Sequence, residues 1–182
     1  MNEKIEIWQE RLRKSIVSGI TVLDFETATE RRDSACQLGL VRLENRRIVE
    51  KRVWLIKPPE DRFTFTYLHG IDAAMVADAP TFDQVWRELA PYVAGQVLAA
   101  HNACFDLGVL RSTLAFYGLQ TPSFTHIDSL YVARQVWPKP IVADHKLNTL
   151  AQYLGLPLNH HDAASDAEAC AGILLSAVRS EI

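Results

Sequence analysis

The chain has 182 residues, of which 48% are hydrophobic and 23% are charged, and its formal net charge is −3. This balance is typical of a globular protein with enough length for a substantial core. The sequence contains no long basic run from which nucleic-acid binding could be argued, and no apolar run long enough to span a bilayer.

The cysteine pattern indicates a reducing environment. Cys36, Cys104 and Cys170 are odd in number and scattered, and no two of them form a CxxC pair. Neither a zinc knuckle nor a disulfide framework is therefore indicated, and reduced thiols are usual in the cytosol. Because the N-terminus is charged and carries no apolar signal segment, we expect a cytoplasmic protein with no membrane attachment.

The first predicted element is an amphipathic helix over residues 3–14. Ile5, Trp8 and Leu12 fall on one helical face, and Glu and Arg residues fall on the other. We expect this apolar face to pack on the rest of the protein rather than to serve a partner.

Three strands and a long connection follow this helix. Residues 20–25 form a short apolar run rich in β-branched residues, which predicts a buried strand ending at Asp24. Residues 36–43 and 48–56 flank a polar turn, which predicts an antiparallel hairpin. The less regular segment 60–79 is interpreted as a surface loop with short helical turns.

The second half of the chain alternates helices and strands. Thr81 is a suitable N-cap for a helix that runs to about Tyr92, and Gly118 would close a helix over residues 104–117. The remaining predicted elements are strands 97–100 and 124–127 and helices 129–136, 146–154 and 164–179.

This order of elements predicts an α/β protein with a mixed five-stranded sheet and helices on both faces. The sequence shows no second core, linker or internal repeat. We therefore expect one domain over residues 1–182, with its core at about 19–178.

Two acidic residues on the first strand indicate a metal site. Asp24 and Glu26 are two positions apart, so their side chains share one face of the strand, and Phe25 points to the opposite face. Two neighbouring carboxylates repel each other unless a cation lies between them, and hard oxygen ligands suit magnesium or manganese. Taken alone, the pair also fits a solvated strand end.

A third acid, Asp106, lies in the first turn of the helix that follows strand 97–100. An acid at a helix N-terminus is also an ordinary partner of the helix dipole, so this position alone does not define a site. Asn102 either caps that helix or holds a loop to the site. His101 fits a hydrogen-bonded structural residue better than a ligand.

The last polar motif precedes the C-terminal helix. His161 lies five positions before Asp166, which we place a little over one turn inside the helix. A histidine whose pKa is near neutrality can accept a proton from water. His160 is the neighbouring rival for this role, and the spacing favours His161.

Together, these motifs resemble those of the DEDDh exonucleases of the RNase H-like superfamily, most closely the DnaQ-like group that includes epsilon proofreading subunits. Asp-x-Glu, Asn-x-x-Phe-Asp and His-x4-Asp occur in the family's order, and residues 68–71 resemble its His-Gly-Ile loop. The sequence departs from the family's Asp-x-Glu-Thr-Thr-Gly, because Ala28 and Thr29 follow Thr27 without a glycine. The geometry of this turn is therefore left open.

The resemblance implies a metal-dependent 3′–5′ exonuclease that releases nucleoside 5′-monophosphates by a two-metal mechanism with Mg²⁺ or Mn²⁺. Asp24, Glu26, Asp106 and Asp166 would be the metal ligands. Asp24 would contact both ions, and Asp106 would hold its ion partly through water. His161 would be the general base that deprotonates the attacking water.

The resemblance also implies a pocket for the terminal nucleotide. Phe25, the backbone around Thr27 and His69 would line it, and Asn102 would join them from the loop after strand 97–100. Strand alternation argues against Phe25, because it turns the ring away from the carboxylates.

The leading functional hypothesis is cleavage at DNA 3′ ends, in proofreading or DNA repair. An exoribonuclease with the same chemistry is the nearest alternative, because the contact that recognises a 2′-hydroxyl depends on pocket shape. The chain ends soon after the last predicted helix, so we expect either a free-standing nuclease or one that docks on a DNA polymerase. A non-catalytic binding module is disfavoured by the complete residue set, and no Gly-rich phosphate loop supports a nucleotide-cofactor enzyme.

Overall fold

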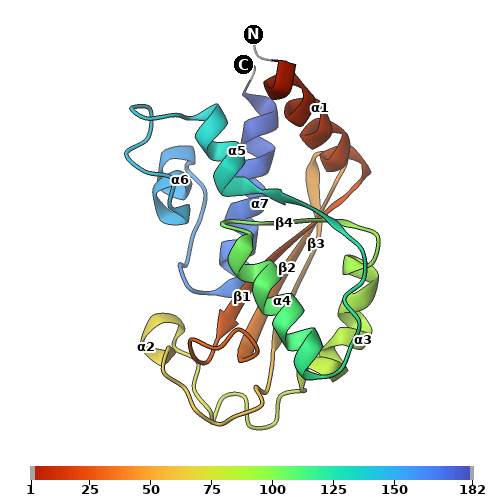
Figure 1. Ribbon diagram of the computed structural model, residues 1–182. Helices are drawn as coiled ribbons and strands as arrows, with labels where there is room; N and C mark the ends of the chain where they lie inside the picture. The colour runs from red at the N-terminus through yellow and green to blue at the C-terminus, as the bar shows by residue number, and fades with distance from the viewer. Residues whose placement is uncertain (1–2, 181–182) are drawn as a thin grey trace.

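The computed structural model describes residues 3–180, and for residues 3–8 it describes only the helical backbone (Figure 1). Its centre is a five-stranded sheet with the strand order β3-β2-β1-β4-β5. The strands are β1 (Ile20–Thr27), β2 (Ala35–Glu44), β3 (Arg47–Leu55), β4 (Val97–Ala100) and β5 (Thr125–Asp128). β2 pairs antiparallel with both β1 and β3, whereas β4 pairs parallel with both β1 and β5. The predicted mixed sheet is thus confirmed.

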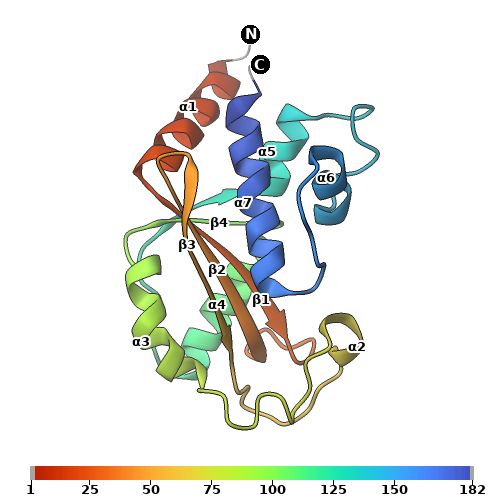
Figure 2. The ribbon, with the colours of Figure 1, turned by 180° about the vertical axis from the view of Figure 1, so that it is seen from behind.

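Helices cover both faces of the sheet, as predicted (Figures 1 and 2). One face packs against α1 (Glu3–Ser18), α5 (Ser129–Val136), α6 (Leu147–Leu154) and α7 (Ala163–Arg179). The other face packs against α3 (Phe82–Val93) and α4 (Cys104–Phe116). The short helix α2 (Thr66–His69) lies in the long connection between β3 and α3. Each face therefore has its own apolar cluster. β1 contributes side chains to both clusters, because successive side chains of a strand point to opposite faces.

Two predicted boundaries are wrong by more than one residue. β1 continues past Asp24 to Thr27, which pairs with Ala35 after an irregularity in the register. The first helix continues past residue 14 to Ser18, because Ile16 extends the apolar face.

The prediction that the first helix packs on the rest of the protein is confirmed for the part whose side chains are described. Leu12 and Ile16 are buried in the same cluster as α7. The side chains of Ile5 and Trp8, which we predicted on this face, lie outside the described residues. Across the described part of the chain, no helix combines the length and apolar character needed to cross a membrane.

Candidate active site

The carboxylates of Asp24 and Glu26 lie half-buried on the β1 face that also carries Val22 and packs toward α7. Phe25 points to the opposite face, where its ring is 2% exposed and lies 6.4 Å from the Phe82 ring between centroids. The alternation predicted for this strand is confirmed. A contact between the Phe25 ring and a nucleotide is contradicted, because that ring belongs to the core.

Asp106 is buried in the first turn of α4, the helix that follows β4. β4 ends at Ala100 and pairs with β1 only at Thr21 and Val22, so the rest of this side of β1 has no partner strand. The Asp106 carboxylate takes that place, since its Oδ1 accepts a 2.9 Å hydrogen bond from the N–H of Phe25. The helix is thereby fixed beside the carboxylates of β1.

The start of α7 is held by two hydrogen bonds and by its close packing on β2. Asp162 caps the helix by accepting a 3.0 Å hydrogen bond from the N–H of Ser165. The N–H of Ala163 donates to the side-chain oxygen of Gln37 on β2, at 3.0 Å. A Cβ atom at Gly39, also on β2, would overlap the carbonyl group of Ala163. The helix therefore approaches the sheet as closely as it does only because residue 39 is glycine.

Asp166 lies in the first turn of α7, which begins at Ala163, and not a little over one turn inside the helix as predicted. Its Oδ2 accepts hydrogen bonds from the backbone N–H of His161 at 3.2 Å and from Nδ1 of His160 at 3.0 Å. Its Oδ1 is buried and, among the described residues, has no hydrogen-bond partner. A buried acceptor without a partner costs about 1–3 kcal/mol, and more when it is charged, so this oxygen is well suited to a cation.

The fold brings three of the four predicted metal ligands into one group. One carboxylate oxygen each of Asp24, Glu26 and Asp166 lie within 4.8 Å of one another. Asp106 is outside this group and is engaged with the backbone of β1. A set made only of carboxylate oxygens fits a hard divalent cation.

The electrostatics of the site also favour a bound cation. Burial and then repulsion from the neighbouring acids raise the pKa of Asp24 well above its ordinary value. The same two causes raise the pKa of Glu26 to about 8, and burial raises the pKa of Asp106 to about 7. Burial likewise raises the pKa of Asp166. Because a nearby cation stabilises the ionised form of each group, metal binding would relieve this repulsion.

Two adjacent histidines lie against Asp166. The rings of His160 and His161 stack with 4.0 Å between centroids, and a ring nitrogen of each lies within 4.8 Å of the Asp166 carboxylate. His161 has a left-handed backbone with φ of 69°, which turns the chain into α7. Burial and the neighbouring His160 lower the pKa of His161, which keeps its imidazole neutral and able to accept a proton at neutral pH.

His69 connects the end of β1 to the loop after α2. Its Nε2 donates to the carbonyl oxygen of Thr27 at 3.1 Å, and its Nδ1 accepts from the N–H of Ile71 at 3.0 Å. This network assigns a neutral tautomer with the proton on Nε2, consistent with the lowering of the His69 pKa by burial. Both ring nitrogens are therefore engaged by the backbone, and His69 braces the loop next to Thr27.

Asn102 lies exposed at the start of α4, with a left-handed backbone. The alternative that its side chain caps α4 is wrong, because the N-cap is Ala103 and the first turn of α4 has no side-chain capping hydrogen bond. The loop is held instead by Asp128, whose carboxylate accepts from the N–H groups of Asn102 at 3.0 Å, Ala103 at 3.2 Å and Leu130 at 2.9 Å. Sequence reasoning missed Asp128, although an acid between a strand and a helix is a typical N-cap signal.

The structural role predicted for His101 is confirmed. Its Nε2 donates to the carbonyl oxygen of His145 at 2.9 Å, and its Nδ1 accepts from the hydroxyl of Ser129 at 2.8 Å. Burial lowers the pKa of His101, in keeping with a neutral ring. The contact joins the loop before α4 to the loop before α6.

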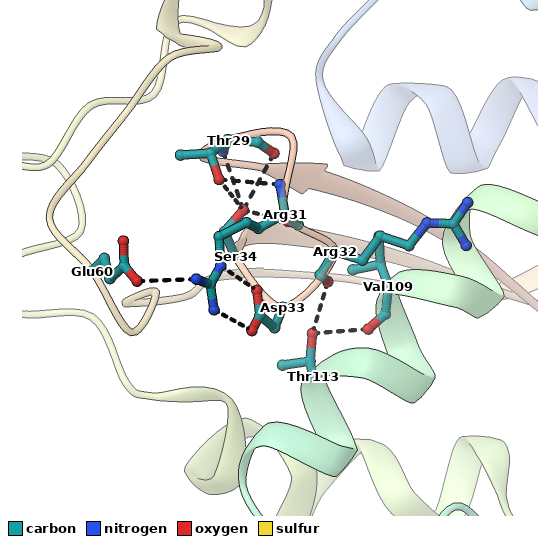
Figure 3. Close-up of polar contacts among 8 residues, drawn as sticks. All are labelled: Thr29, Arg31, Arg32, Asp33, Ser34, Glu60, Val109 and Thr113. Atoms are coloured by element: carbon teal, nitrogen blue, oxygen red, sulfur yellow. Dashed lines mark hydrogen bonds and ion pairs between the residues drawn. The ribbon is translucent and has the colours of Figure 1, made fainter.

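The β1–β2 connection, where the family motif has a glycine, is closed by side chains (Figure 3). The hydroxyl of Ser34 donates to the carbonyl of Arg31 at 2.6 Å and accepts from the N–H of Thr29 at 3.1 Å. Arg31 pairs with Asp33 at 2.7 Å and with Glu60 at 3.3 Å. None of residues 28–34, all of which the structure describes, has a positive φ. The turn therefore does not require a glycine.

A cavity of about 880 Å³ opens directly onto this cluster. Asp24, Asp166 and His160 line it, together with residues of α5, α6 and the loop between these helices. Asn102 and His101 also line it. The buried carboxylates therefore face a space large enough for a substrate.

Comparison with known proteins gives a consistent picture. Residues 21–174 match the RNase_T family model, which describes an exonuclease. The PolC-type DNA polymerase III of Caldanaerobacter subterraneus subsp. tengcongensis is 33% identical over 165 residues. That match covers 88% of this chain and 12% of the polymerase. The similarity is thus confined to a small part of a much longer relative.

Solved structures share the fold. Exonuclease X in complex with 5′ overhanging duplex DNA has a TM-score of 0.71 at 22% identity, over 89% of this chain and 92% of that chain. A 3′-exonuclease that recognises the 3′ end of a histone mRNA stem-loop has a TM-score of 0.73 at 18% identity, over 90% of this chain and 82% of that chain. The expected RNase H-like α/β architecture is confirmed.

Proposed function

Since the chain belongs to the RNase_T family of exonucleases, we propose that it is a metal-dependent 3′–5′ exonuclease that removes nucleoside 5′-monophosphates from DNA 3′ ends. The observation that carries this proposal is the cluster of Asp24, Glu26 and Asp166, in which one buried Asp166 oxygen has no partner. Carboxylates whose pKa values are raised by burial and mutual repulsion, beside a large cavity, mark a functional site.

The residues fit two divalent cations, Mg²⁺ or Mn²⁺. Asp24, Glu26 and Asp166 would hold them directly, and Asp106, which is already engaged with the backbone of β1, would act at longer range through water. Bound ions would supply charge stabilisation for both the attacking and the departing oxygen of an in-line displacement.

The chain's own groups would handle the proton and the orientation of the substrate. His161, neutral at physiological pH, would accept the proton of the attacking water. Asp166 would orient the loop that carries His161, because its carboxylate accepts hydrogen bonds from the backbone N–H of His161 and from the ring N–H of His160. Thr27, at the end of β1, and Asn102, in the β4–α4 loop, would contact the terminal nucleotide.

DNA is the favoured substrate because the curated relative is a DNA polymerase and Exonuclease X was solved with DNA. The structural likeness to an exonuclease on histone mRNA supports RNA as the second candidate. We further propose action in the cytoplasm, which the three free cysteines support, and association with a DNA polymerase in proofreading.

A time course on 5′-labelled single-stranded DNA and on the matching RNA, with Mn²⁺, tests this function. We expect a ladder that shortens from the 3′ end, and its rate on each polymer identifies the substrate. Excess chelator should abolish the ladder, and added Mg²⁺ or Mn²⁺ should restore it. A ladder that persists in chelator would contradict the metal-dependent mechanism, and its absence from both polymers with metal-loaded protein would contradict the exonuclease.

A further inference from the structure

The cavity that is lined by Asp24 and Asp166 is also lined by three basic residues. Arg134 lies in the last turn of α5, Lys139 in the loop after it, and Lys146 at the N-cap of α6. All three side chains belong to exposed residues, and among residues 9–180, whose side chains the structure describes, none of them forms an ion pair within 4.0 Å. We call these three residues the basic wall.

One acid lies within the basic wall, but it serves the backbone. The Oδ1 of Asp144 accepts the N–H of Lys146 at 3.0 Å, and its carboxylate is also hydrogen-bonded to Thr149. These contacts, followed by the charges of Lys146 and Lys139, lower the pKa of Asp144. The acid thus orders the start of α6, and the wall keeps an excess of positive charge.

The polarity of the reaction determines which phosphates this wall can meet. An enzyme that removes one nucleotide at a time leaves a single residue on the 3′ side of the scissile bond. Every other backbone phosphate lies on the 5′ side. With about 880 Å³, the cavity is near the upper end of the roughly 300–1,000 Å³ range of small-ligand pockets, so it has room for more than a terminal nucleotide.

We propose that the basic wall binds the backbone phosphates 5′ to the scissile bond of a single-stranded 3′ end. This inference rests on the proposed exonuclease function. Lysine and arginine contacts to phosphates carry no sequence information, so they position any strand over the carboxylates. A single strand can bend into a cavity, whereas duplex DNA is stiff over about 150 base pairs.

The preference for longer substrates provides the test. A dinucleotide has only the scissile phosphate between its nucleosides, whereas a single-stranded pentanucleotide has three further ones that can reach the wall. For the triple variant R134A/K139A/K146A, we expect kcat/KM for the first cleavage of the pentanucleotide, relative to the dinucleotide, to fall about tenfold or more, through KM. Since each phosphate contact on a single strand contributes about 0.7 to the salt slope, the slope for binding should fall by about 2.

A matched variant, K14A/R46A/R179A, removes the same charge from positions that do not line this cavity. It should keep the wild-type ratio and salt slope. The single variant K139A, in the α5–α6 loop, should reduce the slope by about 0.7, and thermal melting reports whether each protein is folded.

Three results would overturn the proposal: an unchanged ratio and salt slope in the folded triple variant, an equal loss in the matched variant, or blunt duplex DNA that binds as tightly as the single strand. If the wild-type protein cleaves neither substrate, the proposed function fails instead. Fluorescence anisotropy of the labelled pentanucleotide then decides about the wall separately, because it measures binding without turnover.

Discussion

Asp24 is the residue on which the site depends most, because repulsion from four other acids acts on it at once. We predict that Asp24→Asn lowers kcat by about 10²–10⁴-fold, since bound metal supplies several kcal/mol of transition-state stabilisation. In chelator the same change removes a buried carboxyl group that resists ionisation in the folded protein, so at pH 8 the melting midpoint should rise by about 2–4 °C, which corresponds to about 1 kcal/mol.

Asp61→Asn, the same chemical change at an exposed position, is the control and should alter neither quantity. Calorimetry in chelator and an initial-rate assay in Mg²⁺ are the two measurements. A folded Asp24→Asn protein with wild-type turnover would exclude the proposed metal site.

Single substitutions can distinguish the roles of His160 and His161. His161→Ala should slow the chemical step by about 10²–10⁴-fold, as loss of a general base typically does. His160→Ala should cost less, about tenfold, because the Nδ1 of His160 hydrogen-bonds to Asp166 and serves to orient it. Single-turnover pH–rate profiles measure this. If His160→Ala has the larger effect and removes the fall in rate at acidic pH, the base is His160.

At the scale of elements, the site depends on how closely α7 approaches β2. Gly39 pairs with Asp24 in the sheet register, and it also lies under the carbonyl of Ala163 at the start of the helix. One glycine therefore sets the distance between the carboxylate of β1 and that of α7. Because α7 packs on both strands, the helix cannot shift without moving Asp166.

We predict that Gly39→Ala destabilises the protein by about 1–3 kcal/mol, because the new methyl group overlaps rigid backbone. Turnover should fall about 10²-fold, the usual consequence of a displacement of about 1 Å in a catalytic constellation. Gly172→Ala on α7 is the control, since its nearest neighbours are the flexible side-chain ends of Leu156. Denaturant unfolding and steady-state rates report both effects. Equal losses in the two variants would contradict a specific role for residue 39.

For the whole molecule, the raised carboxylate pKa values couple stability to pH. Glu26 has a pKa of about 8 in the folded protein, above its ordinary value of 4.5, so the folded state binds this proton more tightly than the unfolded state. Stability is therefore greatest below the unfolded pKa and decreases as pH rises through the folded value. Asp24, Asp106 and Asp166 shift in the same direction.

We predict that, in chelator, the free energy of unfolding falls as the pH is raised from about 5 to 8. Saturating Mg²⁺ should flatten this dependence, because a bound cation stabilises the ionised carboxylates. Urea titrations at several pH values, with and without Mg²⁺, measure both slopes. A metal-free protein that becomes more stable over this pH range would contradict the electrostatics assigned to the site.

The sequence alone determined the order of helices and strands, the mixed sheet and the set of polar residues on which the site is built. It could do so because these features are local: periodicity identifies a strand or a helix within a few residues. The position of Asp24 and Glu26 in an otherwise apolar strand was equally visible, since burying charge without compensation is costly.

Only the tertiary structure decided how these residues are held. In the folded protein, His160 hydrogen-bonds to Asp166, and Asp106 hydrogen-bonds to the backbone of β1. Asp128 holds the β4–α4 loop through hydrogen bonds to its backbone. Some of these contacts join segments many residues apart, and the choice between adjacent histidines depends on the path of the loop that carries them. The spacing of residues along the chain contains no information about such contacts, because they arise only when the sheet brings the ends of β1, β4 and β5 together with α7.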